Sequence, residues 1–136
     1  MERKTPLYQT HVDAGGKIVE FGGFLMPVQY PTGVLAEHMA VRQKAGLFDV
    51  SHMGELRLKG PDAVANVQKL ITADISTMQD GDIKYAMFCN DAGGILDDFI
   101  VYRCAADDYW LVVNAGNRDK DAAWVESHLF GDVDYR

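Results

Sequence analysis

Residues 93–102 read Gly93-Gly94-Ile95-Leu96-Asp97-Asp98-Phe99-Ile100-Val101-Tyr102. The run is rich in β-branched and aromatic residues and follows a glycine pair, which predicts a β-strand entered from a turn. Side chains along a strand point alternately to its two faces. Asp97 therefore shares a face with Phe99. Asp98 shares the opposite face with Ile100.

The acidic pair conflicts with its apolar neighbours. A carboxylate buried among apolar side chains is destabilising unless it has a hydrogen-bond donor, an edge position or a ligand. Conflicts of this kind concentrate at functional sites, although structural hydrogen-bond networks also produce them. The pattern leaves two interpretations open: Asp97 and Asp98 serve a function, or both bind backbone amides near the hairpin end.

The acidic strand has strand-like neighbours along the chain. Residues 84–89 precede it and residues 109–114 follow it. The turn at residues 90–94 contains two glycines, which adopt positive φ without strain and suit a hairpin. Residues 55–59 alternate polar and apolar side chains as a half-buried strand does, and residues 133–135 can begin a last strand. These segments predict one sheet.

Two helices separate these strands. The first spans residues 63–71, after a proline suited to the first helical turn, and the second spans residues 117–129. The order strand, helix, three strands, helix, strand predicts an α+β fold in which helices cover one face of an antiparallel sheet. We expect residues 51–136 to form such a domain, close to a ferredoxin-like split unit.

Residues 1–50 have a different texture. Glycine pairs at 15–16 and 22–23 and prolines at 27 and 31 interrupt regular structure. One helix is expected, over residues 32–45, because apolar side chains recur there at helical spacing. The segment is predicted to be an irregular N-terminal arm that carries one helix.

Composition excludes several classes of protein. The 136 residues are 48% hydrophobic, which suits one ordinary core. With 13 Lys and Arg against 20 Asp and Glu, the net charge of -7 disfavours nucleic acid as a partner. The first residues lack the apolar run of a signal peptide or membrane anchor, so an intracellular site is expected. Cys89 and Cys104 lack metal-ligand spacing, and we expect two buried thiols and no metal site.

Residues 93–103 resemble a motif of the glycine-cleavage T-protein family, the aminomethyltransferases. Three further segments resemble motifs of that family in the expected order: Thr5-Pro6-Leu7-Tyr8, Phe21-Gly22-Gly23-Phe24-Leu25-Met26-Pro27-Val28-Gln29-Tyr30 and Val41-Arg42-Gln43-Lys44-Ala45-Gly46-Leu47-Phe48-Asp49-Val50-Ser51-His52-Met53-Gly54-Glu55. Four collinear motifs that cover nearly the whole chain are far more specific than any one of them.

The resemblance implies a reaction of one-carbon metabolism and glycine catabolism. In the family, the aminomethyl group carried by the lipoylated H-protein gives its methylene to the co-substrate tetrahydrofolate. Ammonia and 5,10-methylenetetrahydrofolate are the products. Family enzymes are about three times longer than this chain, so the resemblance implies a cytoplasmic, bacterial-type N-terminal part whose folate-binding domain, including residues 1–50, is completed by downstream sequence.

The resemblance also implies roles for single residues. The family's essential carboxylate is the second Asp of its Gly-Gly-x-x-Asp-Asp motif, which falls on Asp98. Its folate slot maps to Met53, Tyr85, Val112 and Asn114 beside Asp98. Each of these four has a structural alternative: core packing for Met53 and Val112, a half-buried sheet aromatic for Tyr85, and a helix cap for Asn114.

Two alternative functions remain open at this point. One is a folate-binding fragment or paralogue without transferase activity. The other is a relative that uses the same scaffold for different one-carbon chemistry, such as a folate-dependent demethylase. The acidic pair in its full Gly-Gly context favours the aminomethyltransferase.

Overall fold

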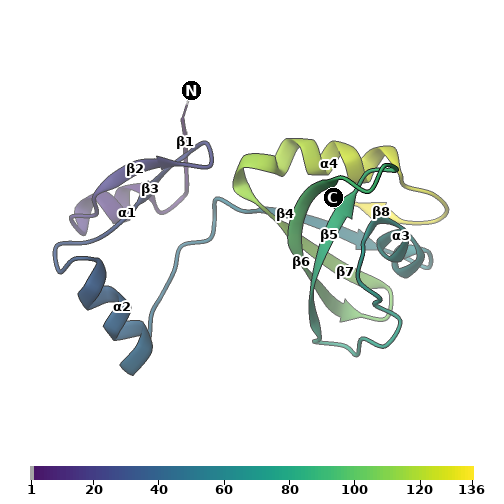
Figure 1. Cartoon of the computed structure of the whole chain (residues 1–136), viewed down its shortest axis with the longest axis horizontal. Helices are drawn as coiled ribbons and strands as arrows, with labels where there is room; N and C mark the ends of the chain where they lie inside the picture. Colours follow the sequence, from purple (N-terminus) through teal and green to yellow (C-terminus); the bar gives the residue numbers. More distant parts are fainter. Residues whose placement is uncertain (1) are drawn as a thin grey trace. The chain divides into compact units, whose positions relative to one another are not determined.

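The chain forms two compact units, of which the first ends at His52 and the second is Met53–Arg136. The computed structural model describes residues 2–136. Each unit has a β-sheet of its own, with three strands in the first and five in the second (Figure 1).

The second unit has the predicted order of elements. They are β4 (Gly54–Lys59), α3 (Ala63–Leu70), β5 (Ile83–Cys89), β6 (Ile95–Ala105), β7 (Asp108–Val113), the short 3-10 helix η1 (Ala115–Asn117), α4 (Arg118–Ser127) and β8 (Asp134–Tyr135). The predicted α+β class with an antiparallel sheet is confirmed.

The strand order of this sheet is β5-β6-β7-β4-β8, and all neighbouring strands are antiparallel. Strands β7 and β8 both pair antiparallel with β4, so they run parallel to each other with β4 between them. The segment β7-α4-β8 is therefore a split βαβ unit. The hairpin of β5 and β6 extends the sheet on the far side of β7.

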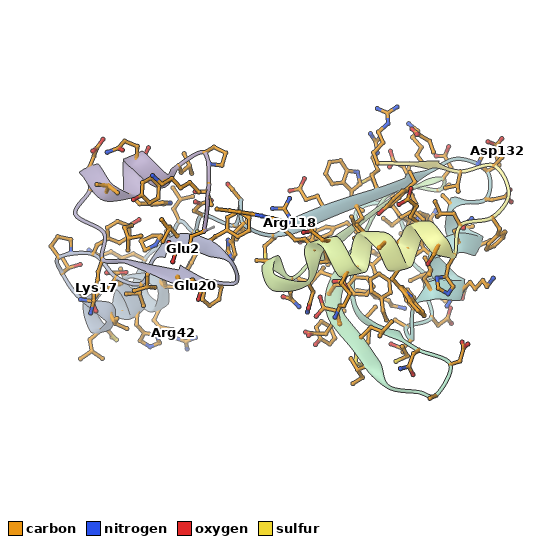
Figure 2. The ribbon with its side chains drawn as sticks, turned by 90° about the horizontal axis from the view of Figure 1, so that it is seen from above. Glu2, Lys17, Glu20, Arg42, Arg118 and Asp132 are labelled. Carbon is orange, nitrogen blue, oxygen red and sulfur yellow. The ribbon has the colours of Figure 1, made fainter. Side chains whose placement is uncertain are left out.

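Both helices of the second unit cover the same sheet face. Val67 and Leu70 of α3 and Val125 of α4 pack with alternate residues of the strands in one core. Within that core the rings of Phe88 and Phe99 lie 4.0 Å apart between centroids. The opposite sheet face has no helix of this unit, and its Tyr85 side chain is 61% exposed. Figure 2 looks down on α4, which begins at Arg118.

A buried asparagine joins α3 to the chain that follows α4. Asn66 is fully buried, and its Nδ2 donates to the carbonyls of Asp62 (2.8 Å) and Phe130 (2.9 Å). Its Oδ1 accepts from the backbone N–H of Phe130 at 3.0 Å. The same loop carries Asp132, labelled in Figure 2, whose N–H donates to the Asp62 carboxylate at 2.7 Å. These bonds fix the path of the chain into β8.

The first unit is more regular than predicted. It contains β1 (Arg3–Lys4), α1 (Tyr8–Asp13), β2 (Ile18–Phe21), β3 (Phe24–Pro27) and α2 (Val34–Gln43). The prediction of an irregular segment with a single helix is therefore wrong. Gly22 and Gly23 have φ of 57° and 85°, so they form the two-residue turn of the β2–β3 hairpin rather than merely interrupting structure.

Helix α2 forms where it was expected; none of its residues is buried, and Leu35 is 82% exposed. One further prediction needs correction. Cys104 is exposed and Cys89 is half-buried, so neither is a buried thiol. Cys104 has the same parity along β6 as Asp98 and Ile100, so strand alternation places its side chain on the open face of the sheet rather than in the core.

A hydrogen-bonded group holds the first unit together. His11 Nε2 lies 2.8 Å from Asp49 Oδ2, and His11 Nδ1 lies 2.7 Å from the Tyr30 hydroxyl. Thr5 Oγ1 donates to the same Asp49 oxygen at 3.0 Å. Burial acts to raise the pKa of Asp49, but hydrogen bonds from His11, Ser51 and Thr5 outweigh it and hold that pKa well below its usual range. Asp49 is therefore ionised at neutral pH.

Asp49→Asn is expected to destabilise the first unit at pH 7 by about 1–3 kcal/mol, because a charged acceptor with several donors is lost. A lowered folded-state pKa gives stability that is present above the unfolded pKa and lost as pH falls through the folded pKa. The difference from the parent should therefore shrink below about pH 4. Trp110 and Trp124 lie in the second unit, so tryptophan fluorescence does not report on unfolding of the first. Amide hydrogen exchange at residues 18–27, in the first unit, is the suitable measurement.

Asp13→Asn is the matched control, since Asp13 is exposed and bonds only locally with Gln9 at 2.8 Å. Exchange at residues 18–27 should be the same in this variant as in the parent. Equal protection in Asp49→Asn and Asp13→Asn at pH 7 would show that the His11–Asp49 contact adds no stability.

Among residues 2–136, no helix is long and apolar enough to cross a membrane, and the longest helices, α2 and α4, have ten residues each.

Candidate functional site

The acidic pair of β6 is divided between the two faces of the sheet, as alternation predicts. Asp97 points to the helix-covered face and is 6% exposed. Asp98 is exposed on the open face. The two aspartates therefore sit in opposite environments although they are adjacent in sequence.

Asp98 has a phenol beside it. The Tyr85 hydroxyl donates to Asp98 Oδ2 at 2.5 Å. This bond to a carboxylate, followed by burial and by the charges of Asp98 and Asp97, raises the pKa of Tyr85, so the phenol stays protonated near neutral pH. Tyr85 thus supplies a fixed donor and an aromatic ring next to an exposed carboxylate.

A row of side chains crosses the open face next to Asp98. On β5, β6 and β7, Tyr85 pairs with Ile100 and Ile100 pairs with Val112. Cross-strand partners share a face, so these three form one apolar and aromatic strip. Asp98 lies two residues before Ile100 and therefore stands at the edge of this strip. Ile100 was not among the predicted site residues, although strand alternation predicted that it shares a face with Asp98.

Met53 and Asn114 continue the next row. Gly54 pairs with Val113, and this register extended by one residue puts Met53 opposite Asn114. Asn114 in turn donates from Nδ2 to the backbone carbonyl of Asp98 at 2.7 Å. Met53 and Val112 are both half-buried, so neither is fully enclosed in the core. The structure thus brings all five predicted residues to one end of one sheet.

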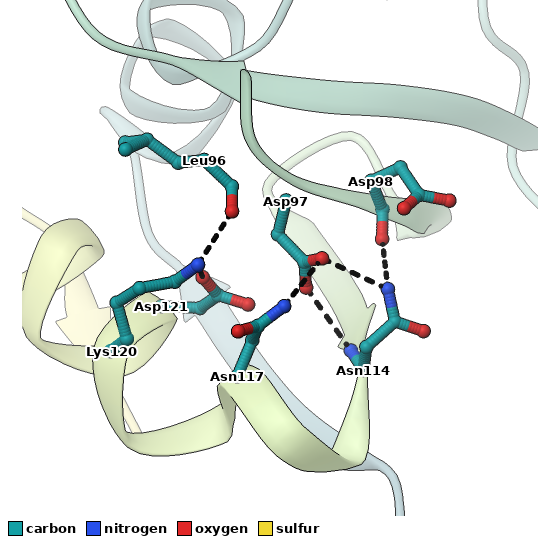
Figure 3. A network of polar contacts seen from close by, with 7 residues as sticks. All are labelled: Leu96, Asp97, Asp98, Asn114, Asn117, Lys120 and Asp121. Carbon is teal, nitrogen blue, oxygen red and sulfur yellow. Dashed lines mark hydrogen bonds and ion pairs between the residues drawn. The ribbon is translucent and has the colours of Figure 1, made fainter. Parts of the chain in front are cut away.

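Asn114 is engaged on the protein side of this group. Its Nδ2 also donates to Asp97 Oδ1 at 3.0 Å, and its backbone N–H reaches Asp97 Oδ2 at 3.4 Å. Asn114 stands immediately before η1, but its side chain makes no cap hydrogen bond there, so the cap alternative is wrong. Its side-chain oxygen points away from both aspartates (Figure 3). That oxygen is the part of Asn114 available to a ligand.

Asp97 is held by amides from the start of α4. Asn117 Nδ2 donates to Asp97 Oδ1 at 2.8 Å, beside the bond from Asn114 (Figure 3). Burial acts to raise the pKa of Asp97, yet hydrogen bonds from Asp121, Asn114 and Asn117 lower it on balance. Asp97 is therefore a buried, ionised anchor.

Two residues of α4 complete the group and were not predicted. Asp121 is fully buried, and Lys120 Nζ donates to the Leu96 carbonyl at 2.5 Å. The sequence contained a signal for Asp121, because it lies four residues before the buried Val125 on the same helix face. Asn117 lies four residues before Asp121, so helical spacing places these two side chains on the same side.

This arrangement has a definite chemical capacity. An exposed carboxylate stands at the edge of a flat apolar strip, with a phenolic donor beside it. Such a carboxylate can orient a nitrogen, accept its proton or stabilise positive charge on a bound ligand. Within residues 2–136, no group of three or more His, Cys, Asp or Glu is placed to hold a metal ion.

Comparison with known proteins shows which family the chain matches. The family model described as the GCVT N-terminal domain matches residues 7–136. An aminomethyltransferase of Desulfitobacterium hafniense is 54% identical over 129 residues, which are 95% of this chain and 35% of that protein. An aminomethyltransferase of Bacillus licheniformis is 48% identical over 136 residues, covering 100% of this chain and 37% of the relative.

A solved structure shares the fold. The glycine cleavage system aminomethyltransferase T from Bartonella henselae matches with a TM-score of 0.94 and 40% identity. The match covers 99% of this chain and 38% of that one. The chain thus spans little more than a third of the length of these relatives.

Proposed function

Because the chain belongs to the aminomethyltransferase family of glycine-cleavage T-proteins, whose N-terminal domain it matches, we propose that it forms the N-terminal part of an enzyme that transfers a methylene group to tetrahydrofolate. The donor is the aminomethyl group on the lipoyl arm of H-protein, and the products are 5,10-methylenetetrahydrofolate and ammonia. The whole enzyme acts in glycine breakdown in the cytoplasm.

The observation that carries this proposal is the position of Asp98. Forming the new carbon–nitrogen bond requires a folate nitrogen to lose a proton as it attacks, while positive charge develops on the methylene and the leaving amine. A carboxylate beside the folate nitrogen serves both needs. Asp98 is exposed on an open sheet face and accepts from the Tyr85 hydroxyl, so it is available to substrate.

The neighbours of Asp98 suit a pterin ring. A ring of this kind needs a flat slot with apolar or aromatic walls and a few polar groups at its edge. Tyr85 and Val112, with Ile100 between them, supply a wall, while Met53 and Asn114 stand at the strand ends. In the proposed enzyme, downstream sequence closes the slot, and residues 1–50 belong to the same folate-binding domain.

The test uses this chain extended by its downstream sequence. The extended protein is titrated with tetrahydrofolate and then assayed for ammonia and methylenetetrahydrofolate with loaded H-protein. We expect saturable folate binding and transfer that requires both partners. Folate binding without ammonia release would favour the binding-protein alternative, and methyl removal from a methylated amine would favour the demethylase. A protein that neither binds folate nor releases ammonia would contradict the proposal.

A further inference from the structure

A buried carboxyl that the proposed chemistry does not use lies beneath the acidic pair. Asp121 is 0% exposed, and in the described part of the chain neither of its side-chain oxygens has a hydrogen-bond donor. Lys120 Nζ is 3.9 Å from Asp121 Oδ1, but its hydrogen bond goes to the Leu96 carbonyl. An ionised carboxylate in this position would be buried without a hydrogen bond, which is strongly unfavourable.

The donors that Asp121 lacks all converge on Asp97. Asp97 receives the side-chain amides of Asn114 and Asn117 and the backbone N–H of Asn114. In Figure 3, Asp121 lies between Lys120 and Asp97. A carboxylate only accepts hydrogen bonds, whereas a protonated carboxyl also donates one through its O–H. The negative charge therefore belongs on Asp97 and the proton on Asp121.

We propose that Asp97 and Asp121 share one proton, carried by Asp121, and that this pair positions Asp98 by fixing the amide of Asn114. The two N–H groups of Asn114 Nδ2 reach Asp97 Oδ1 and the Asp98 carbonyl at 3.0 and 2.7 Å. An acceptor-only Asp97 orients that amide with its nitrogen toward β6. Asp121 is thus a positioning residue, and this part of the inference rests on the proposed function of Asp98.

The surrounding charges agree with one shared proton. Burial, then the hydrogen bond and negative charge of Asp97 on β6, raise the pKa of Asp121 to about 7, while Lys120 on α4 acts in the opposite direction. The pKa of Asp97 is lowered, because the bonds from Asp121, Asn114 and Asn117 outweigh burial. The pair titrates as a unit and keeps one proton across mildly acidic pH.

Stability gives the first test. A carboxyl whose folded pKa is raised contributes stability that is fully present below the unfolded pKa and lost as pH rises through the folded pKa. Asp121→Asn replaces the O–H donor by N–H and does not ionise. The melting temperature of the variant minus that of the parent should rise between pH 5.5 and about pH 7, by roughly 5 °C, and should level off above the folded pKa. Asp91→Asn, at an exposed hairpin position, is the control and should show no such rise.

The second test observes the side-chain amides that bind Asp97 directly. In ¹⁵N spectra of the extended protein, the side-chain amides of Asn114 and Asn117 should shift with a midpoint near pH 7. The shift should vanish in Asp121→Asn. At pH 6 that variant should keep the parent's signals, while Asp121→Ala, which has no donor, should displace them.

A melting-temperature difference that is the same at pH 5.5 and 8.5 would overturn the shared proton. Asn114 signals that ignore pH in the parent, or that are unmoved in Asp121→Ala, would overturn the positioning role. Both measurements require neither folate nor H-protein, so failure of the transferase assay and failure of this inference are separate results.

Discussion

Asp98→Asn is expected to lower aminomethyl transfer by at least about 100-fold, the range that loss of a positioned proton acceptor gives. Asn has nearly the same size, and its side-chain oxygen still accepts from the Tyr85 hydroxyl. It has no negative charge and is a very poor proton acceptor. Asp98 is exposed, so the fold should not change. Ammonia release by the extended protein is the measurement, and urea unfolding followed by tryptophan fluorescence reports on the fold.

Asp97→Asn is the matched comparison and should show the reverse pattern. An amide at position 97 places N–H groups against the donors of Asn114 and Asn117 and removes the anion that Asp121 faces. We expect a clear loss of stability and a smaller loss of transfer than in Asp98→Asn. Transfer by Asp98→Asn equal to that of the parent would refute the catalytic assignment.

The separation of these two aspartates was predictable because it depends on local geometry. Strand alternation fixes which face each side chain of β6 takes, and burial of Asp97 with exposure of Asp98 follows it. Helical spacing worked in the same way for α3, which forms where it was predicted and buries Val67 and Leu70 on one face. A period of two or of 3.6 residues is a property of the chain itself.

What sequence reasoning missed depends on contacts between distant segments. Strand β1 pairs with β3 across some twenty residues, with Arg3 opposite Phe24. Neither strand exceeds four residues, which is too short for an alternating pattern to predict it. Asp121 reads as an ordinary charge in the first turn of a helix. Its protonation follows only once the start of α4 is known to lie against Asp97.

Helix α2 shows what periodicity leaves undetermined. Its apolar residues recur at helical spacing, which predicted the helix. The helix is present, but no residue of it is buried. Periodicity thus identified the local structure, while burial depends on a partner surface that periodicity does not describe.

Phe88→Ala is expected to cost about 3–5 kcal/mol of unfolding free energy in the second unit, as large core truncations do. Phe88 is 0% exposed, and its ring lies 4.0 Å from that of Phe99. In the sheet it pairs with Asp97 on one side and bridges to Ile71 on the other. The cavity left by Ala would therefore open directly beside the buried anchor of the site. Urea unfolding followed by the fluorescence of Trp110 and Trp124 measures the loss.

Ile83→Ala is the control, because Ile83 belongs to the same strand but is 57% exposed. It should cost less than about 1 kcal/mol, as exposed truncations usually do. If Phe88→Ala does not fold, Phe88→Leu, with an expected cost of about 1–1.5 kcal/mol, keeps the comparison measurable. Equal costs for the Phe88 and Ile83 variants would mean that the helix-covered face is not the core of this unit. A larger loss of unfolding free energy at Phe88 than at Ile83 means that the core under the helix-covered face stabilises the sheet. That sheet holds Asp97 and Asp98 on opposite faces.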